Sequence, residues 1–226
     1  MIRSMASFVF VCAVSISAFA ADPKKEAVKD AVALKDHFNV KKDKNWHGGS
    51  EENHLAELKN AELKSEGISF DVVDGAMQLG SSMQPNKPEK IEKIKVGRKA
   101  GNLHFLQASG HSAPQNTLVG KYVVIYADKS TVDIEIIYGK HIHDWWCSET
   151  DEPSESTVAW TGGNPNAKQN DKILKVFHMS WKNPSPEKEI ATIDFCTVDV
   201  KQPCAPFCLA ITAESVKEKE KEKEKK

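Results

Sequence analysis

The chain has 226 residues, with 31 lysines and arginines against 32 aspartates and glutamates, so its formal net charge is −1. This balance excludes the strong basic field by which many proteins attract nucleic acid or acidic membranes. The length suggests one domain with appendages, large enough to bury roughly 70% of its unfolded surface without needing disulfides to build a core.

The first twenty residues have the features of an export signal. Arg3 places a positive charge ahead of an apolar run at 6–19, and Ala18-Phe19-Ala20 offers the small residues of a signal-peptidase site. The apolar run is shorter than the roughly 20 residues of a membrane span. We therefore expect cleavage near Ala20 and a periplasmic or extracellular mature protein with no membrane span.

After the signal, residues 21–44 are rich in lysine and aspartate and predict a linker with a marginal helix. Short strands separated by turn signals then follow through a predicted β-sandwich domain at 45–213. The expected strands are 67–72, 76–79, 91–96, 103–108, 122–127, 131–138, 158–160, 173–181, 190–198 and 207–212. Asp74-Gly75 predicts a hairpin turn between the first two of them.

Residues 120–146 carry the clearest pattern in the chain. The segment 122–127 is rich in β-branched and aromatic residues, and a short polar break at 128–130 separates it from 131–138. In the latter segment Val132, Ile134 and Ile136 alternate with Thr131, Asp133 and Glu135. A period of two on each side of a polar turn predicts an antiparallel hairpin with one buried face.

The later segments complete an all-β prediction. Residues 173–181 carry apolar side chains on both faces, which is typical of a central strand. Many short strands and no convincing long helix indicate a sandwich or jelly roll. From Lys217 onward, lysine and glutamate alternate without an apolar residue to dock the segment, so we expect residues 214–226 to be a disordered tail.

Export changes the interpretation of the cysteines. With Cys12 in the signal, four remain in the mature chain: Cys147, Cys196, Cys204 and Cys208. An even number in an oxidising compartment is compatible with disulfides, and four cysteines allow three pairings among which the sequence does not choose. The alternative is that some of them are buried free thiols.

Several motifs together resemble a known family. They are VGRKAGNLHFLQAS at 96–109, VGKYVVIYAD at 119–128, IIYG…DWW at 136–146, SWKNPSPEKEIATIDF at 180–195 and AITA at 210–213. Over residues 45–213 the chain resembles secreted bacterial domains of the galactose-binding-like, carbohydrate-binding-module-like family. The resemblance implies a jelly-roll sandwich and carbohydrate binding. Lys129 departs from the family, which more often has glycine in this turn.

Tryptophans and neighbouring polar residues supply the candidate site. An exposed indole stacks on the apolar face of a sugar while polar side chains bind its hydroxyls. We expect Trp46 and one of the adjacent pair Trp145 and Trp146 to be exposed, because neighbours in an extended segment point to opposite faces. The expected polar partners are Asn45, His104 and Asp144. The alternatives are that most tryptophans lie in the core and that His104 is a satisfied structural residue.

Other polar residues give weaker signals. His141 and His143, with Cys147 nearby, have a metal-like spacing, but pairs of this kind are more often solvated positions at a strand edge. The acidic loop 149–155 offers oxygen ligands for a structural calcium ion without a recognisable spacing. We therefore expect no cofactor or metal. Asp194, in an apolar strand, is expected to accept backbone hydrogen bonds or to pair with a cation.

The sequence therefore predicts an exported, non-catalytic β-sandwich that recognises carbohydrate through loops at one end. It has no GxSxG, HExxH or glycine-rich phosphate loop. The alternative is a structural or protein–protein interaction module without a small-molecule ligand. A hydrolase would require a cleft with two carboxylates about 5 to 10 Å apart, and no pair stands out.

Overall fold

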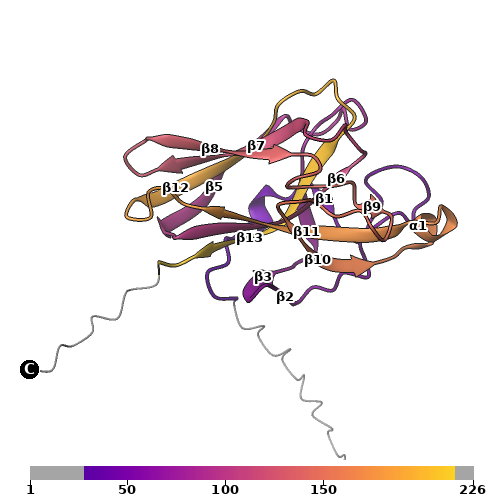
Figure 1. Cartoon of the computed structure of the whole chain (residues 1–226), viewed down its shortest axis with the longest axis horizontal. Coiled ribbons are helices and arrows are strands. Elements are labelled where there is room, and N and C mark those ends of the chain that lie inside the picture. Colours follow the sequence, from indigo (N-terminus) through magenta and orange to yellow (C-terminus); the bar gives the residue numbers. More distant parts are fainter. Residues whose placement is uncertain (1–27, 217–226) are drawn as a thin grey trace, which may run out of the picture.

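The computed structural model describes residues 28–216, and the chain folds there as an all-β sandwich (Figure 1). The strands are β1 (Val40–Lys41), β2 (Glu62–Ser65), β3 (Ile68–Asp71), β4 (Gly75–Gln78), β5 (Lys90–Lys99), β6 (Asn102–Gly110), β7 (Leu118–Tyr126), β8 (Thr131–Ile137), β9 (Trp146–Cys147), β10 (Thr157–Gly162), β11 (Ile173–Lys182), β12 (Glu189–Thr197) and β13 (Ala205–Glu214). A short 3-10 turn, η1 (Lys35–His37), and a short helix, α1 (Pro165–Gln169), complete the described elements. No helix among residues 28–216 has both the length and the apolar character needed to cross a membrane.

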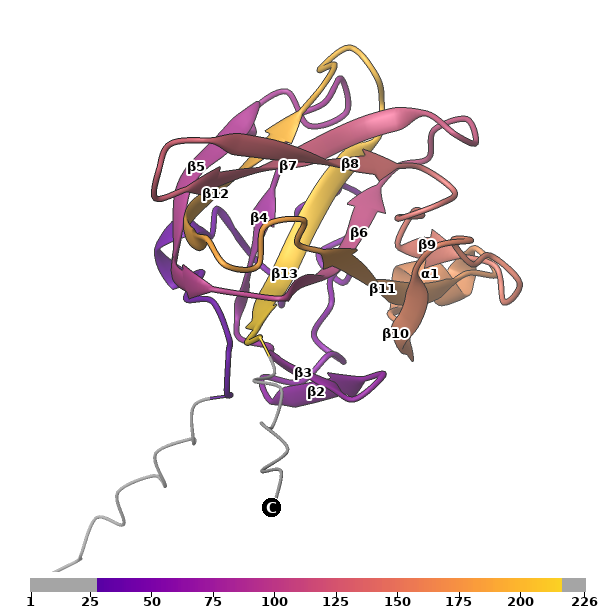
Figure 2. The same ribbon diagram turned by 60° about the vertical axis from the view of Figure 1, so that its left-hand side comes forward.

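Two antiparallel sheets form the two layers (Figures 1 and 2). One has the order β1-β4-β13-β6-β11-β10, with β9 also paired to β11, and the other has the order β5-β12-β7-β8. Three aromatic rings join the layers: Phe105 stacks on Tyr122 with ring centroids 4.0 Å apart, and Tyr122 stacks on Phe195 at 4.7 Å. All three are fully buried, so the main core lies between the sheets.

The central hairpin is confirmed. Strands β7 and β8 pair antiparallel around a polar turn, in which Lys129 adopts a left-handed conformation with φ of 69°. The alternating residues Ile134 and Ile136 are buried while Asp133 and Glu135 are exposed. The prediction of a central strand at 173–181 is also confirmed, because β11 is hydrogen-bonded to β6 on one side and to β10 and β9 on the other.

The predicted hairpin at Asp74-Gly75 is wrong. Strand β3 pairs with β2, whereas β4 pairs with β1 and β13, so the chain changes sheet at this turn. Glycine is required at Gly75 for space and not for a turn, because a Cβ there would lie 2.4 Å from the ring of Phe38.

A second core lies on the outer face of the seven-stranded sheet. The segment between β1 and β4 crosses this face and buries Leu55, Leu58 and Phe70 against β11 and β13. Trp145 and Phe207 belong to the same cluster. The covering segment brings the loop at residues 45–53 beside the loops around Asp144 and α1, at one end of the sandwich.

The described part of the predicted linker, residues 28–44, packs on the sandwich. From Val28 onward it runs along the sandwich, where the Val32 amide donates to the carbonyl of Ile211 at 2.9 Å. Val32 and Leu34 are buried in the main core, and the only helical turn of this segment within residues 28–44 is η1. The predicted signal at 1–20 lies outside the described residues, as does the tail beyond Val216. Residue Glu214 still belongs to β13.

The four cysteines of the described chain are buried free thiols: Cys147, Cys196, Cys204 and Cys208. None of the three possible disulfide pairings is formed, which corresponds to the alternative that the sequence left open. Burial raises the pKa of Cys147, Cys204 and Cys208 to about 12. A thiol with such a high pKa carries almost no thiolate at neutral pH and is a poor nucleophile.

Candidate functional site

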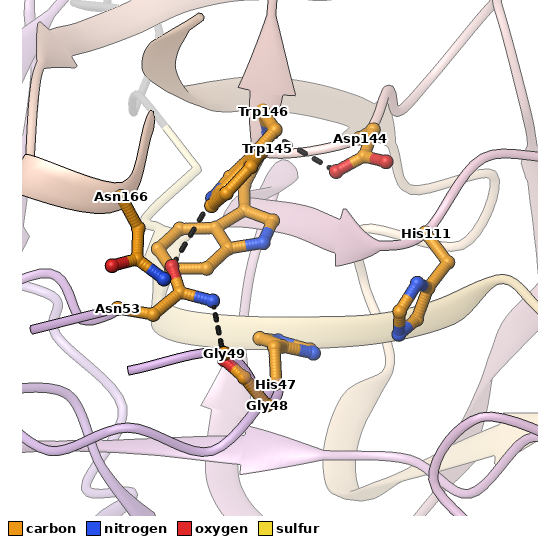
Figure 3. Close-up of a pocket in the computed structure, with 9 residues that line it drawn as sticks. All are labelled: His47, Gly48, Gly49, Asn53, His111, Asp144, Trp145, Trp146 and Asn166. Carbon is orange, nitrogen blue, oxygen red and sulfur yellow. Dashed lines mark hydrogen bonds between the residues drawn. The ribbon is translucent and has the colours of Figure 1, made fainter. Parts of the chain in front are cut away.

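A hollow of about 250 Å³ lies where four segments meet at one end of the sandwich (Figure 3). Its walls come from the loop after β1, from the end of β6, from the segment that enters β9, and from α1. The lining residues are His47, Gly48, Gly49, Asn53, His111, Asp144, Trp145, Trp146 and Asn166. The hollow combines two indoles with amide, imidazole and carboxyl groups, which is the mixture expected of a small-ligand site.

The two adjacent tryptophans differ in burial, as predicted, but both line the same hollow. Trp145 is buried, with 2% of its surface exposed, whereas Trp146 is partly exposed. Backbone hydrogen bonds fix both residues, because the Trp145 amide donates to Ser109 at 2.8 Å and Trp146 pairs with Leu174 of β11. The Trp146 indole nitrogen donates to Asn53 Oδ1 at 3.2 Å, which orients the ring along the wall of the hollow.

Trp46 is not the exposed platform that the sequence predicts. Its ring stacks on Trp145 with centroids 5.5 Å apart and an interplanar angle of 21°. Its indole nitrogen donates to Gln78 Oε1 at 3.0 Å, which is a buried side chain. One face of Trp46 is therefore covered by Trp145, and Trp46 supports the wall of the hollow instead of lining it.

Asn45 also differs from its predicted role as a ligand-binding residue. Its side-chain oxygen accepts hydrogen bonds from the amides of His47 and Gly48, at 3.1 and 3.0 Å. Its side-chain nitrogen donates to the carbonyl of Ser50 at 2.7 Å. Asn45 therefore fixes the shape of its own loop, and through that loop the position of His47.

Asp144 lies in the hollow, as predicted, and its environment perturbs its acidity. Burial raises its pKa from 3.8 to about 6, against the opposing effect of hydrogen bonds to the carboxylate. Those bonds come from the amide of Trp146 at 3.0 Å and from the hydroxyl of Ser112 at 3.1 Å. A carboxyl group that titrates near neutral pH inside a hollow is typical of functional sites.

Two histidines line the hollow beside Asp144. His47 packs against Trp145 with ring centroids 5.3 Å apart, and His111 lies edge-on to His47 at 6.0 Å. Burial, followed by the neighbouring His111 and Lys87, lowers the pKa of His47 to about 3. Burial also lowers the pKa of His111, so both rings are neutral at pH 7. Gly110 has no room for a side chain, because a Cβ would lie 2.1 Å from the His47 ring.

His104 is not in the hollow. It lies on β6 and is buried, and its Nδ1 is 2.9 Å from Ser180 Oγ and 3.0 Å from His178 Nε2. Its other nitrogen lies 3.4 Å from a carboxylate oxygen of Glu214. The neighbouring His178 contacts Ser65 Oγ at 3.1 Å. His104 is thus a satisfied structural residue, the alternative that the sequence left open.

His141 and His143, whose spacing resembles that of metal ligands, make separate contacts within the protein. His141 accepts a hydrogen bond from the amide of Ile137 at 3.1 Å and lies 3.4 Å from Glu155, whereas His143 packs on Tyr138 at 4.8 Å. In the acidic loop, Asp151 accepts from the amide of Ser148 at 2.8 Å. Within residues 28–216, no group of three or more histidine, cysteine or acidic side chains is arranged to hold a metal ion.

A second and larger depression, of about 390 Å³, opens between β8 and β11. Trp181 lines it together with three acidic side chains: Asp133, Glu135 and Glu155. Two of the acids are neutralised by lysine, since Asp133 pairs with Lys121 at 2.6 Å and Glu155 with Lys140 at 3.3 Å. No sequence pattern predicts this depression, because it depends on how the two sheets meet.

The sequence-based site did not include six of the nine residues that line the hollow: His47, Gly48, Gly49, Asn53, His111 and Asn166. Two signals were present. In the sequence, Asn45 to Gly49 and Asn164 to Asn166 are polar segments next to strands, where binding residues concentrate, although the second segment begins α1 in the structure. Comparison with protein-family models, with curated proteins and with solved structures finds no match for this chain.

Proposed function

We propose that this chain is an exported, non-catalytic jelly-roll domain that binds carbohydrate in the hollow at its loop end. The observation that carries the proposal is the convergence of Asp144, Trp145 and Trp146 with two asparagines and two histidines around one cavity. The partly exposed Trp146 offers an apolar face for sugar C–H groups. Asn53, Asn166 and the imidazoles offer donors and acceptors for hydroxyl groups.

The strand order supports the jelly-roll part of the proposal. Eight of the eleven strands in the two layers, without β1, β9 and β10, are in chain order β4, β5, β6, β7, β8, β11, β12 and β13. Numbered from one to eight, they lie in the orders 1-8-3-6 and 2-7-4-5, because the sheets contain β4-β13-β6-β11 and β5-β12-β7-β8. Strands that alternate between two four-stranded sheets in this way are typical of two interleaved Greek keys.

The size of the hollow limits the ligand. At about 250 Å³ it lies below the roughly 300–1,000 Å³ of cavities that enclose drug-sized molecules. A single sugar unit, such as the end of a glycan chain, is therefore the ligand that the proposal favours over the interior of a long polymer.

A glycan array probed with the mature chain tests the proposal. We expect binding to a subset of glycans that share a terminal sugar, and a loss of at least tenfold in affinity for Trp146→Ala. Trp181→Ala is the matched control, because Trp181 is also partly exposed but lines the depression between β8 and β11. A blank array for the wild-type chain, or a loss confined to Trp181→Ala, contradicts the proposed site.

The second candidate is a structural or protein–protein interaction module. One observation favours it: none of the tryptophans at positions 46, 145, 146, 160 and 181, all within the described chain, is fully exposed. The open sugar platform expected from Trp46 is closed by its stacking on Trp145. A wild-type chain that binds no glycan on the array but retains a folded, monodisperse state would favour this second candidate.

A further inference from the structure

Two buried imidazole nitrogens in the hollow have no hydrogen-bond partner. They are Nε2 of His47 and Nε2 of His111. Buried polar side-chain atoms nearly always have a partner, so each exception requires a water, an ion or a function to explain it. Within residues 28–216 four side-chain atoms are unpartnered in this way, and two of them lie on neighbouring rings in the same hollow.

The spacing of the two rings leaves room for an atom between them. Their centroids are 6.0 Å apart and their planes meet at 81°, and Figure 3 shows each ring turning a nitrogen toward the other. A zinc–nitrogen bond of about 2.0–2.1 Å places two rings that share an ion about 5–6 Å apart. The directly hydrogen-bonded rings of His104 and His178 are closer, with centroids at 5.2 Å.

Neighbouring groups can hold His47 in the form that binds a metal. Its Nδ1 lies 3.3 Å from the side-chain amide of Gln84. The oxygen and nitrogen of an amide are assigned from its hydrogen bonds, so the Gln84 oxygen can be turned toward Nδ1. In that arrangement it accepts a hydrogen bond from Nδ1–H and leaves the lone pair of Nε2 free. An outer partner that fixes the tautomer in this way is typical of metal-binding histidines.

We propose that His47 and His111 together bind one transition-metal ion of the class that prefers imidazole, such as Cu²⁺, Ni²⁺ or Zn²⁺. Imidazole suits these ions, whereas Ca²⁺ and Mg²⁺ prefer oxygen ligands. With two protein ligands, the remaining coordination positions face the hollow and are open to water or to a hydroxyl group of a ligand. The proposal adds a site to the hollow and does not depend on the glycan hypothesis.

Calorimetric titration of the untagged mature chain with CuCl₂, NiCl₂ or ZnCl₂, and with CaCl₂ for comparison, tests the proposal. We expect one ion per chain, with Cu²⁺ bound more tightly than Ni²⁺ or Zn²⁺ and no binding of Ca²⁺ at this site. His47→Ala and His111→Asn should each weaken binding at least tenfold. Asparagine is chosen at His111 because the backbone there has a φ of 62°, which asparagine tolerates well.

His141→Ala is the matched control, because it removes an imidazole that lies outside the hollow. It should leave the affinity unchanged. Since His47→Ala can disturb the packing on Trp145, the Cu²⁺ electron paramagnetic resonance spectrum provides a second measurement, in which the wild type should show two imidazole nitrogens and His111→Asn one. No bound ion in the wild type, or binding that both hollow variants retain, overturns the proposal. The titration uses the metal alone, so its failure would leave the glycan proposal intact.

Discussion

The sandwich contains two close histidine pairs that differ in how their nitrogens are satisfied. His104 and His178 hydrogen-bond to each other and to Ser180, and His178 also reaches Ser65. His47 and His111 approach each other at the loop end, yet Nε2 of each lacks a partner. We call His104 and His178 the complete pair, because their hydrogen bonds are those expected of a structural network. We call His47 and His111 the open pair, because their unpartnered nitrogens are those expected of a binding site.

The difference follows from the elements that carry the two pairs. His104 and Ser180 are directly opposite each other on the paired strands β6 and β11, so the register of the sheet closes that network. His47 and His111 lie in loops that meet only because residues 45–72 cross the sheet. Loops on a rigid scaffold tolerate groups that are incompletely satisfied, and for this reason they carry most binding sites.

The largest expected effect comes from breaking the complete pair. His178→Ala removes a ring buried against Phe70, with centroids 4.9 Å apart, and leaves Ser65 and His104 with fewer partners. A cavity together with lost buried hydrogen bonds should lower the free energy of unfolding by about 4 kcal/mol. Urea denaturation followed by tryptophan fluorescence measures this change.

If the two histidine pairs differ in this way, a substitution at His111 should have little effect on stability. His111→Asn removes a nitrogen that has no partner in the fold, so the free energy of unfolding should change by less than about 1 kcal/mol. Equal losses for His178→Ala and His111→Asn would show that the distinction between the two pairs has no energetic basis.

The complete pair should also make stability depend on pH. Burial, followed by the charge of His104 and opposed by Glu66, lowers the pKa of His178 from 6.5 to about 4. Burial also lowers the pKa of His104, against the opposing effect of Glu214. The unfolded chain therefore takes up protons below pH 6.5 before the folded chain does, so stability is complete above pH 6.5 and is lost as the pH falls toward 4.

The contribution of His178 to this loss is on the order of 3 kcal/mol. It is measured as the difference between the wild type and His178→Ala in urea denaturation at pH 7 and at pH 4.5. The cost of the substitution should shrink at the lower pH, because the wild type alone has lost the advantage of a neutral buried ring. A cost that stays constant or grows on acidification contradicts the assigned direction.

The open pair can be disturbed without changing either histidine. Gly110→Ala places a Cβ 2.1 Å from the His47 ring, which must move. We expect a loss of about 2 kcal/mol in the free energy of unfolding from this overpacking. Gly101→Ala is the control, because a Cβ there lies 3.8 Å or more from other atoms, and it should lower the free energy of unfolding by less. Gly97→Ala is unsuitable as a control because its positive φ strains any other residue. If the two alanine variants are equally stable, the loop can move aside, and the close packing of His47 is not required.

Local periodicity explains which parts of the fold could be predicted. The hairpin β7–β8 and the central strand β11 follow from residues that are neighbours in the sequence. Asp194 was also predictable, because a carboxylate in an apolar strand needs partners, and it accepts from the Lys93 amide at 2.8 Å and pairs with Lys90 at 2.9 Å. The docking of Val32 and Leu34 was not predictable, because the run Ala31-Val32-Ala33-Leu34 is too short to show a period and lies in a charged segment.

The same reasoning explains which residues of the candidate site could be predicted. Asp144, Trp145 and Trp146 lie together in the hollow because they are consecutive, and the alternation predicted that one of the two indoles is exposed, whereas Trp146 is only partly exposed. His47 and His111 could not be paired from the sequence, since their contact depends on the crossing of a distant segment. His104 and Asn45 have the right residue types for ligand contacts, but their hydrogen bonds are used within the protein.

The only gain in stability is expected at the carboxyl group of the hollow, Asp144. Burial raises the pKa of Asp144 to about 6, so at pH 7 the fold holds a carboxylate that it would bind better as a neutral group. Asp144→Asn keeps an acceptor for the Trp146 amide and removes the charge, and we expect it to raise the free energy of unfolding at pH 7 by about 1 kcal/mol. The gain should be smaller at pH 5, where the wild-type group is largely protonated in the fold, and should disappear only below the unfolded pKa of 3.8. Parallel urea denaturation at the two pH values measures both changes. A variant that is less stable than the wild type at pH 7 would show that the charge of Asp144 stabilises the fold, as the complete histidine pair does. The carboxylate would then have a structural role and would not be reserved for a ligand.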